Sequence, residues 1–385
     1  MNHPLQNTAY YTFDEGAAQR RAAYLKSRLP DNVSLCYAVK ANPFLIPAFR
    51  GRVPRFELCS PGEARIAQAA GVPSDQTVIS GLVKTSAFLE ELIRDSRDRI
   101  YTVESLSQWE MFCDLARKYQ KPISLLLRLT NDSQFGLDRE DLIRLVAERE
   151  NNPLLEIRGL QFFSGTQKSS LKKIRRELEA LEELLDELEE KADYIPRELE
   201  YGPGFPVSYF EGEEWDEEAY LEGFSDLLNQ MRHRLPLYLE LGRSLAASCG
   251  NYYTFVADIK RNKGQNYLLV DGGMHHLVYY GQYMAMKQPR LFLPGREREE
   301  ARQPYHICGA LCSMNDILAK AVPLPEVKIG ELLCFPQSGA YCVTEGIALF
   351  LSRELPAVYL IDPEGGCRMA RPSTEAAPFN TEYPL

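Results

Sequence analysis

The chain of 385 residues contains no apolar run long enough to cross a bilayer and no excess of positive charge. Because a spanning helix needs about 20 consecutive apolar residues, we do not expect a membrane protein. A formal net charge of −10 also disfavours a general nucleic-acid-binding surface. The first residues, MNHPLQNTAYYTFDEG, lack the basic and apolar segments of a secretory signal, so we expect a cytoplasmic location.

Metal-binding and disulfide patterns are absent as well. The nine cysteines do not have the paired CxxC spacing of a structural zinc site. A chain of this length can bury a large core without disulfide bonds. His275 and His276 are adjacent, but no pattern of metal ligands surrounds them. We therefore expect reduced thiols, with one candidate for a reactive thiol, and no metal site.

Short apolar runs alternate with amphipathic, charged stretches over the first two thirds of the chain. Eight of these runs predict strands, at 33–39, 55–58, 77–80, 99–103, 123–129, 157–163, 197–201 and 237–241. Stretches with helical periodicity lie between them, including 61–70, 106–119 and the leucine-striped run 171–192. Eight strand–helix units in roughly 210 residues match a parallel (β/α)8 barrel of the TIM type, whose active site lies at the carboxyl ends of the strands.

The sequence becomes rich in strand-forming residues after about residue 245. Apolar runs at 252–259, 266–273, 327–335 and 357–361 are separated by glycine, proline and charged turns. They predict a second domain built on an antiparallel sheet. We expect the barrel over residues 28–245 and the β-rich domain over 1–27 and 246–385. The charged segment 294–304 is expected to be a solvated loop, and the C-terminal tail to be irregular.

One strand end raises a chemical question. In VSLCYAVKANP (33–43), a buried apolar strand ends on Lys40, where a cation is costly unless it is paired or its pKa is shifted. The alternative is a lysine whose charged end merely reaches solvent. The barrel would bring other strand ends to the same mouth, including Ser60, Phe163, Glu240 and Arg243.

A phosphate site is predicted on the far side of that mouth. The segment YGPGFP (201–206) offers Gly202 and Gly204, whose backbone N–H groups can approach an anion closely. Such a motif alone more often marks a turn, but its place after the seventh strand is the usual barrel phosphate site. A lysine opposite a phosphate suggests pyridoxal phosphate held as a Schiff base. Glu240 could then keep the pyridine nitrogen protonated.

At this point the motifs resemble those of a known family. In order along the chain they are CYAVKANP (36–43), FELCSPGEA (56–64), SQFGL (133–137), LEYGPGFP (199–206), ELGRS (240–244), VDGGM (270–274), CGALCSMND (308–316) and SGAY (338–341). They are similar to the motifs of the fold-type III pyridoxal-phosphate decarboxylases, the diaminopimelate and ornithine decarboxylase group. The resemblance covers roughly residues 8–360. It implies an alanine racemase-like barrel with a β domain, a homodimer with shared active sites, and loss of carbon dioxide from an amino acid through a Schiff base and a quinonoid.

The resemblance also implies roles for single residues. Lys40 is the Schiff-base lysine, Glu240 pairs with the pyridinium, and Cys312 protonates the carbanion in the neighbouring subunit's site. The residues implied in cofactor binding are Ser60, Phe163, Gly202, Gly204, Arg243 and Tyr341. The candidates for contact with the distal part of the substrate are Asp316, Tyr279 and Tyr283.

The chain departs from the family pattern at three places. Phe163 stands where the family usually has a histidine that stacks on the cofactor, and it can stack but cannot donate a hydrogen bond. Tyr279 and Tyr280 stand where members acting on diaminopimelate carry an arginine, and Ser313 replaces a glutamate. These changes remove groups that hold a charged distal end. The segment FFSGTQ (162–167) resembles a divergent branch acting on carrier-protein-bound amino acids or siderophore precursors.

Two other functions remain open from the sequence. A pyridoxal-phosphate racemase would share the barrel and the Schiff base, although such enzymes tend to place an arginine, not Glu240, against the pyridine nitrogen. A non-catalytic pyridoxal-phosphate carrier is usually a lone barrel, whereas here a β domain with Cys312 and Tyr341 follows.

Overall fold

The computed structural model describes residues 8–96 and 98–383. Its residues form two compact units. The barrel unit comprises 19–206 and 215–244, and the sheet unit comprises the described residues up to 18 together with 207–214 and those after 244. Relative to the boundaries predicted from sequence, residues 19–27 group with the barrel and 207–214 with the sheet unit.

The barrel prediction is confirmed. Eight parallel strands close on themselves in chain order, with the last pairing with the first. They are β2 (Val33–Ala38), β3 (Arg55–Leu58), β4 (Thr77–Ile79), β5 (Ile100–Val103), β6 (Ile123–Arg128), β7 (Leu155–Phe163), β8 (Glu198–Gly202) and β9 (Leu237–Leu241). Their residues are almost all buried, as expected of parallel strands covered on both faces.

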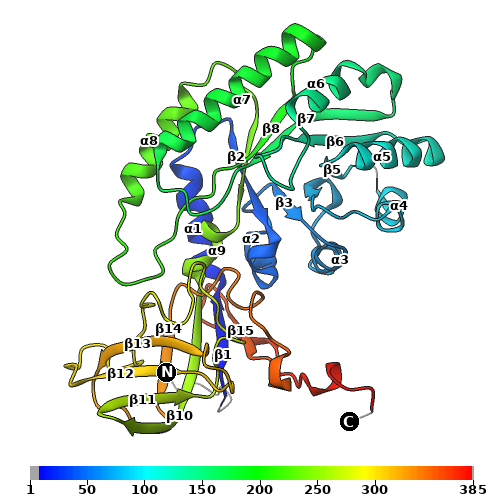
Figure 1. Cartoon of the computed structure of the whole chain (residues 1–385). Helices are drawn as coiled ribbons and strands as arrows, with labels where there is room; N and C mark the ends of the chain where they lie inside the picture. Colours follow the sequence, from blue (N-terminus) through cyan, green and yellow to red (C-terminus); the bar gives the residue numbers. More distant parts are fainter. Residues whose placement is uncertain (1–7, 97, 384–385) are drawn as a thin grey trace. The chain divides into compact units, whose positions relative to one another are not determined.

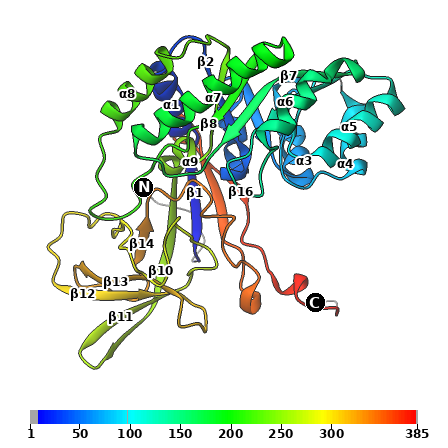
Figure 2. The same ribbon diagram turned by 45° about the horizontal axis from the view of Figure 1, so that its top comes forward.

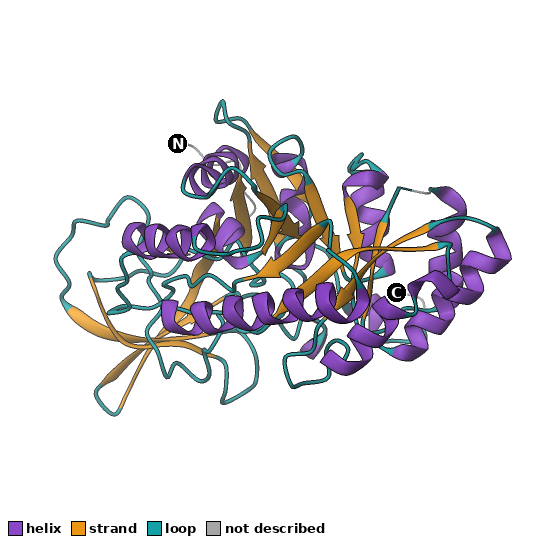
Figure 3. Ribbon diagram, turned by 90° about the horizontal axis from the view of Figure 1, so that it is seen from above, coloured by secondary structure: helices purple, strands orange, loops and turns teal. Residues whose placement is uncertain are grey.

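Helices lie on the outside of these strands (Figures 1 and 3). They are α2 (Ile46–Phe49), α3 (Pro61–Ala69), α4 (Ser86–Asp95), α5 (Leu106–Tyr119), α6 (Arg139–Ala147), α7 (Leu171–Ala192) and α8 (Glu217–Asn229). The hydroxyls of Ser60, Thr85 and Ser105 each accept a hydrogen bond from a first-turn N–H, which explains where α3, α4 and α5 begin. The leucine stripe of α7 is buried, as expected of an outer barrel helix. Two further helices, α1 (Glu15–Ser27) and α9 (Arg243–Ala246), contain two of the chain's four passages between the units.

The sheet unit contains an eight-stranded sheet in the order β13-β12-β11-β10-β1-β15-β16, with β14 pairing with β10. The strands are β1 (Tyr10–Asp14), β10 (Gly250–Asn262), β11 (Gln265–Val270), β12 (Gln303–Cys308), β13 (Ile317–Leu324), β14 (Leu332–Phe335), β15 (Ala357–Ile361) and β16 (Cys367–Arg371). Strand β1 runs beside β10 although the two are far apart in sequence (Figure 2).

Two expectations for this unit need correction. The sheet is mixed, because β1 pairs in parallel with β15, and β11 pairs in parallel with β12. The C-terminal tail is not wholly irregular, because β16 pairs with β15. Among the described residues, no helix has the length and apolarity that crossing a bilayer requires.

Candidate active site

Lys40 follows β2 in a single 3₁₀ turn, Val39–Ala41, at the carboxyl end of the strand. Its Nζ donates to Glu57 Oε2 at 2.8 Å and to Glu240 Oε1 at 3.0 Å. Glu57 lies on β3 and Glu240 on β9, the two strands that flank β2. Lys40 is therefore a paired cation held between two buried carboxyl groups rather than one that only reaches solvent.

The two carboxyl groups differ in their affinity for protons. Burial would raise the pKa of Glu57, but the charge and hydrogen bond of Lys40 outweigh it and lower the pKa to about 2. Burial and the charge of Glu57 raise the pKa of Glu240 to about 8, despite the opposing effect of Lys40. At neutral pH Glu57 is therefore the carboxylate that balances Lys40, and Glu240 keeps its proton.

Loops that follow β7 and β8 pack closely beside this site. A Cβ on Gly204, which has φ +64°, would lie 2.0 Å from the carbonyl oxygen of Gly165, and one on Gly202 would lie 2.4 Å from the Phe163 ring. Glycine is therefore required at both positions. Arg243 Nε donates to Thr166 Oγ1 at 3.3 Å, which adds a cation and a hydroxyl to the same loops. Closely approaching backbone, a guanidinium and a hydroxyl fit a phosphate group.

Ser60 lies at the carboxyl end of β3, where its hydroxyl caps α3 by accepting from Glu63 N at 3.2 Å. Glu63 in turn accepts from Cys59 N, which completes a capping box. The Cys59 thiol donates to Glu57 Oε1 at 3.1 Å and lies 3.7 Å from Lys40 Nζ. The sequence motif FELCS therefore supplies a carboxylate and a thiol beside Lys40, while the cofactor role of Ser60 stays a prediction.

The other predicted site residues lie in the sheet unit. Cys312 is exposed on the loop between β12 and β13. Asp316 is 2% exposed, and its two carboxylate oxygens accept from Met274 N at 2.7 Å and from Leu311 N at 2.8 Å. Asp316 thus joins the Cys312 loop to the segment after β11. Tyr341 is half-buried and has φ +66°.

The two tyrosines named as substrate contacts have different surroundings. Tyr279 is buried, and its hydroxyl donates to the carbonyl oxygen of Pro336. Tyr283 is 59% exposed. A groove of about 90 Å³ lies beside them; its lining residues are Met274, Leu277, Val278, Tyr279, Gln282, Tyr283, Met284, Pro289, Asn315, Ile317 and Leu318. No charged side chain belongs to this lining.

Sequence reasoning missed the polar residues inside the barrel. Glu57, Gln161 and Glu200 are buried on β3, β7 and β8, and Gln161 connects Glu200 to Glu240 through its amide. The signal was present, because a charged residue at every second position of a buried strand, as in RFEL or RELEY, must face the barrel interior. These residues lie within the strands, so a rule limited to strand ends does not select them.

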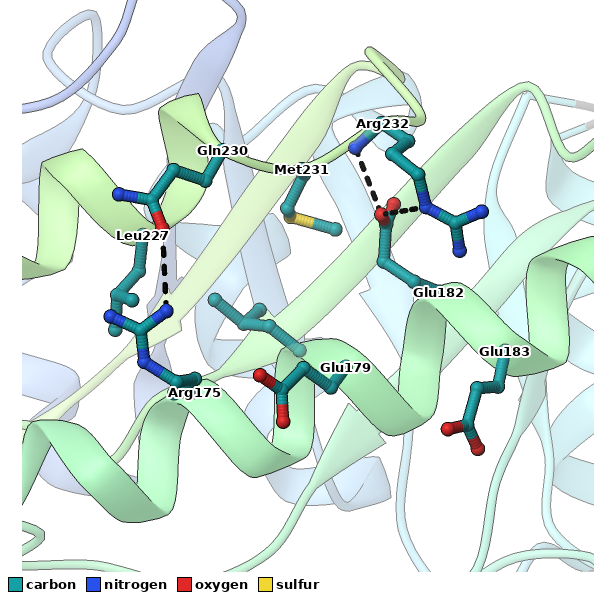
Figure 4. Close-up of a pocket in the computed structure, with 9 residues that line it drawn as sticks. Arg175, Glu179, Glu182, Glu183, Leu227, Gln230, Met231 and Arg232 are labelled. Atoms are coloured by element: carbon teal, nitrogen blue, oxygen red, sulfur yellow. Dashed lines mark hydrogen bonds and ion pairs between the residues drawn. The ribbon is translucent and has the colours of Figure 1, made fainter.

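A larger pocket, of about 300 Å³, lies on the outer surface between α7 and the end of α8 (Figure 4). Arg175 Nη1 donates to Gln230 Oε1 at 3.3 Å, and Arg232 Nε donates to Glu182 Oε2 at 3.1 Å. Glu182 also accepts from the backbone N–H of Arg232, so it caps the turn after α8. None of the lining residues belongs to a strand end, and every charged group bonded here stabilises the helix pair. Among the described residues, no cluster suited to a metal ion is present.

The closed (β/α)8 barrel, with a paired lysine at a strand end and glycine-containing loops after β7 and β8, has the arrangement expected of an enzyme that uses a phosphorylated carbonyl cofactor. A family model described as "Pyridoxal-dependent decarboxylase, C-terminal sheet domain" matches residues 11–339. The chain therefore belongs to the pyridoxal-dependent decarboxylases, and its cofactor is pyridoxal 5'-phosphate.

Several proteins of that family are similar over most of their length. The L-glutamyl-[BtrI acyl-carrier protein] decarboxylase of Niallia circulans is 28% identical over 377 residues, covering 91% of this chain and 87% of that protein. The diaminopimelate decarboxylase of Aquifex aeolicus is 26% identical over 353 residues, covering 87% and 82%. The structure of diaminopimelate decarboxylase from Helicobacter pylori with L-lysine has the same fold, with a TM-score of 0.84 at 21% identity and coverage of 98% and 96%.

These comparisons confirm the family and the fold predicted from sequence. The chain is a pyridoxal-phosphate-dependent amino-acid decarboxylase. The racemase and the non-catalytic alternative gain no support from them.

Proposed function

We propose that Lys40 is the attachment point of the cofactor and that the site removes the α-carboxylate of an amino acid whose distal end is bound to a carrier. The observation that carries the first part is the placement of Lys40 Nζ between Glu57 and Glu240 at a strand end. When bound, pyridoxal phosphate supplies the electron sink for the electron pair left at Cα when carbon dioxide departs.

The chain's own residues then have separate tasks. Glu240 would hold a proton on the cofactor's ring nitrogen, and Glu57 would keep a negative charge beside the Lys40 nitrogen. The backbone at Gly204, with Thr166 and Arg243, would hold the phosphate. Phe163 presents a ring face for stacking without donating a hydrogen bond, and Gly202, Ser60 and Tyr341 complete the cofactor contacts.

Cys312 is proposed as the proton donor to Cα in the site of a second copy of the chain. Its support is an exposed thiol on a loop that Asp316 fixes through Leu311 N and ties to Met274 N after β11. This role requires a homodimer, which light scattering on the purified protein would measure. General acid catalysis of this kind contributes roughly 10²–10⁴-fold, so C312A should lower kcat by that order, while C367A, which removes another exposed thiol, should leave it unchanged.

The substrate proposal is supported by the groove beside the Cys312 loop. Its lining has no cation to pair with a free distal carboxylate, and the Tyr279 hydroxyl is engaged by Pro336. The similar protein from Niallia circulans is named for a glutamyl group on an acyl-carrier protein. A distal carboxyl group converted to a thioester carries no charge and suits such a groove. Asp316 and Tyr283 remain proposed contacts of this end.

Carbon dioxide release should be measured from free diaminopimelate, lysine, ornithine and glutamate and from glutamyl pantetheine thioester. The proposal expects kcat/KM for the thioester to exceed that for free glutamate at least 100-fold. A free diamino acid that reacts faster than the thioester would contradict it. We also infer a cytoplasmic location, which fractionation of cells would test.

The attachment point is tested by reduction with borohydride. Protein loaded with pyridoxal phosphate should gain the cofactor's mass on the peptide that contains Lys40, and its absorption band should be lost in K40A. The variant K172A, which changes an exposed lysine of α7, should keep both signals. A cofactor mass on another lysine would refute the assignment.

A further inference from the structure

The barrel interior beneath Lys40 contains a buried charge cluster. Barrels of this type are usually filled by layers of branched apolar side chains. Here Arg55 on β3 donates to Glu198 Oε2 at 2.9 Å and to Glu200 Oε2 at 3.1 Å. Arg55 is 4% exposed and Glu200 is fully buried. The Arg55 guanidinium also lies 3.4 Å from the centroid of the Tyr238 ring, so it is held on three sides.

Gln161 connects this cluster to the active site. Its Nε2 donates to Glu200 Oε1 at 2.9 Å and to Glu240 Oε2 at 3.3 Å. The other oxygen of Glu240 accepts from Lys40. A continuous chain of polar contacts therefore runs from Arg55 through Glu200, Gln161 and Glu240 to Lys40, with all but the last residue buried.

The Gln161 amide is oriented by its donors. Its Oε1 is buried and has no hydrogen-bond partner among the described residues, while both N–H groups of Nε2 are directed at carboxyl oxygens. Two carboxyl groups that face each other across a single amide repel when both are charged. The amide reduces this repulsion because each N–H favours the ionised form of the oxygen that it contacts.

Other titratable groups face Glu240 from the surrounding strands. They are Lys40 and Cys36 from β2 and its end, Glu57 and Cys59 from β3 and its end, Arg128 from β6, and Glu200 from β8. Glu57 and Glu200 oppose ionisation of Glu240, whereas Lys40 and Arg128 favour it. Gln161 contacts Glu240 and carries no charge, so replacing it changes hydrogen bonding without changing the charge of the site.

We propose that Gln161 is a positioning residue that holds the Glu240 carboxyl group in place and transmits to it the charge balance of the Arg55–Glu200 pair. This inference rests on the proposed role of Glu240 toward the cofactor's ring nitrogen. Loss of the Gln161 amide should make Glu240 ionise at higher pH. Loss of the Glu200 charge should make it ionise at lower pH, because a nearby negative charge is removed.

The test measures the apparent Kd of pyridoxal phosphate by absorbance from pH 5.5 to 9 in wild type, Q161M and E200Q. Binding should weaken on the acid side, where Glu240 is protonated. We expect Q161M to move the pH at which affinity falls upward by about one unit, so that affinity on the acid side is roughly tenfold weaker than in wild type. We expect E200Q to move that pH downward. T102V is the matched control, because it removes a different buried polar group of the barrel, a hydroxyl that bonds Lys84 and not Glu240.

The outcomes separate the inference from the function on which it rests. Absence of cofactor binding in wild type, or an unchanged acid limb in E240Q, would contradict the role of Glu240. The inference about Gln161 would be refuted by a different result: E240Q abolishes the loss of affinity at acid pH, but Q161M shows that loss at the same pH as T102V. If Q161M does not fold, E200Q decides alone, since a shift to higher pH or no shift in E200Q would also refute the coupling.

Discussion

Glu240 should make the stability of the cofactor-free protein fall as the pH rises through the neutral range. Its pKa in the folded protein is about 8, because burial and the negative charge of Glu57 disfavour ionisation. A glutamate in the unfolded chain has a pKa of about 4.3. Between these values the folded state holds a proton that the unfolded state has lost. The stability that Glu240 contributes is therefore fully present below about pH 4 and is lost progressively as the pH rises to about 8.

The magnitude follows from one proton. Each pH unit changes the free energy of unfolding by about 1.4 kcal/mol, so the contribution of Glu240 falls by roughly 4 kcal/mol between pH 5 and pH 8. Glu57 has a lowered pKa, so its own contribution is lost only as the pH falls below about 4.5, and it is constant over this window. The variant E240Q has no proton to lose and should lack the slope.

Thermal unfolding followed by circular dichroism at pH 5, 6, 7 and 8 would measure this difference. For a unit of the barrel's size, 1 kcal/mol corresponds to roughly 2–4 °C in Tm. The Tm of E240Q relative to wild type should therefore rise by roughly 10 °C over the series. E179Q, which removes an exposed carboxyl group from α7, is the control. A Tm difference that stays the same from pH 5 to pH 8 would show that Glu240 is ionised throughout, and the reasoning would be wrong.

Three further substitutions test other parts of the structure. R55M leaves the fully buried Glu200 without its cation, while Glu198 keeps only Arg158, and should lower the free energy of unfolding by roughly 3–5 kcal/mol in denaturant titrations. K168M removes the bonds that Lys168 makes to Ser164 Oγ and to a glutamate of α7, and should weaken cofactor affinity several-fold, while K172M at the helix surface should not. D316N replaces one of the two carboxylate oxygens that accept from Met274 N and Leu311 N, so backbone amide hydrogen exchange in 309–316 should become faster. Unchanged exchange would contradict the proposal that Asp316 fixes this loop.

Much of the barrel could be predicted because each parallel strand is buried on both faces and reads as an apolar run. The predicted strands 55–58 and 237–241 match β3 and β9 to the residue, and the long predicted helix 171–192 matches α7. The sheet unit was harder. Strand β1 and strand β16 pair with partners far away in sequence, and no local pattern specifies such pairing.

The candidate site was predictable only in part. The rule that barrel enzymes use strand ends selected Lys40 and Glu240, which the structure brings within hydrogen-bond distance. Glu57 and Gln161 lie within strands, and their inward direction follows only once the barrel is closed and its register is known. Contacts of this kind depend on tertiary geometry, so the sequence indicated the residue types but not the network.

The buried cluster also separates stability from site chemistry. Removing Arg55 alone leaves the buried Glu200 unpaired, whereas replacing it together with Glu198 and Glu200 by apolar residues of similar volume leaves only Arg158, which is partly exposed, without its partner. Replacing a buried ion network by apolar residues in this way often leaves the stability of a protein unchanged or raises it. We therefore expect R55M/E198L/E200L to be more stable than R55M, yet to keep an altered pH dependence of cofactor binding, because Gln161 has lost its charged neighbour. A triple variant as unstable as R55M would show that packing, not unpaired charge, dominates at this position.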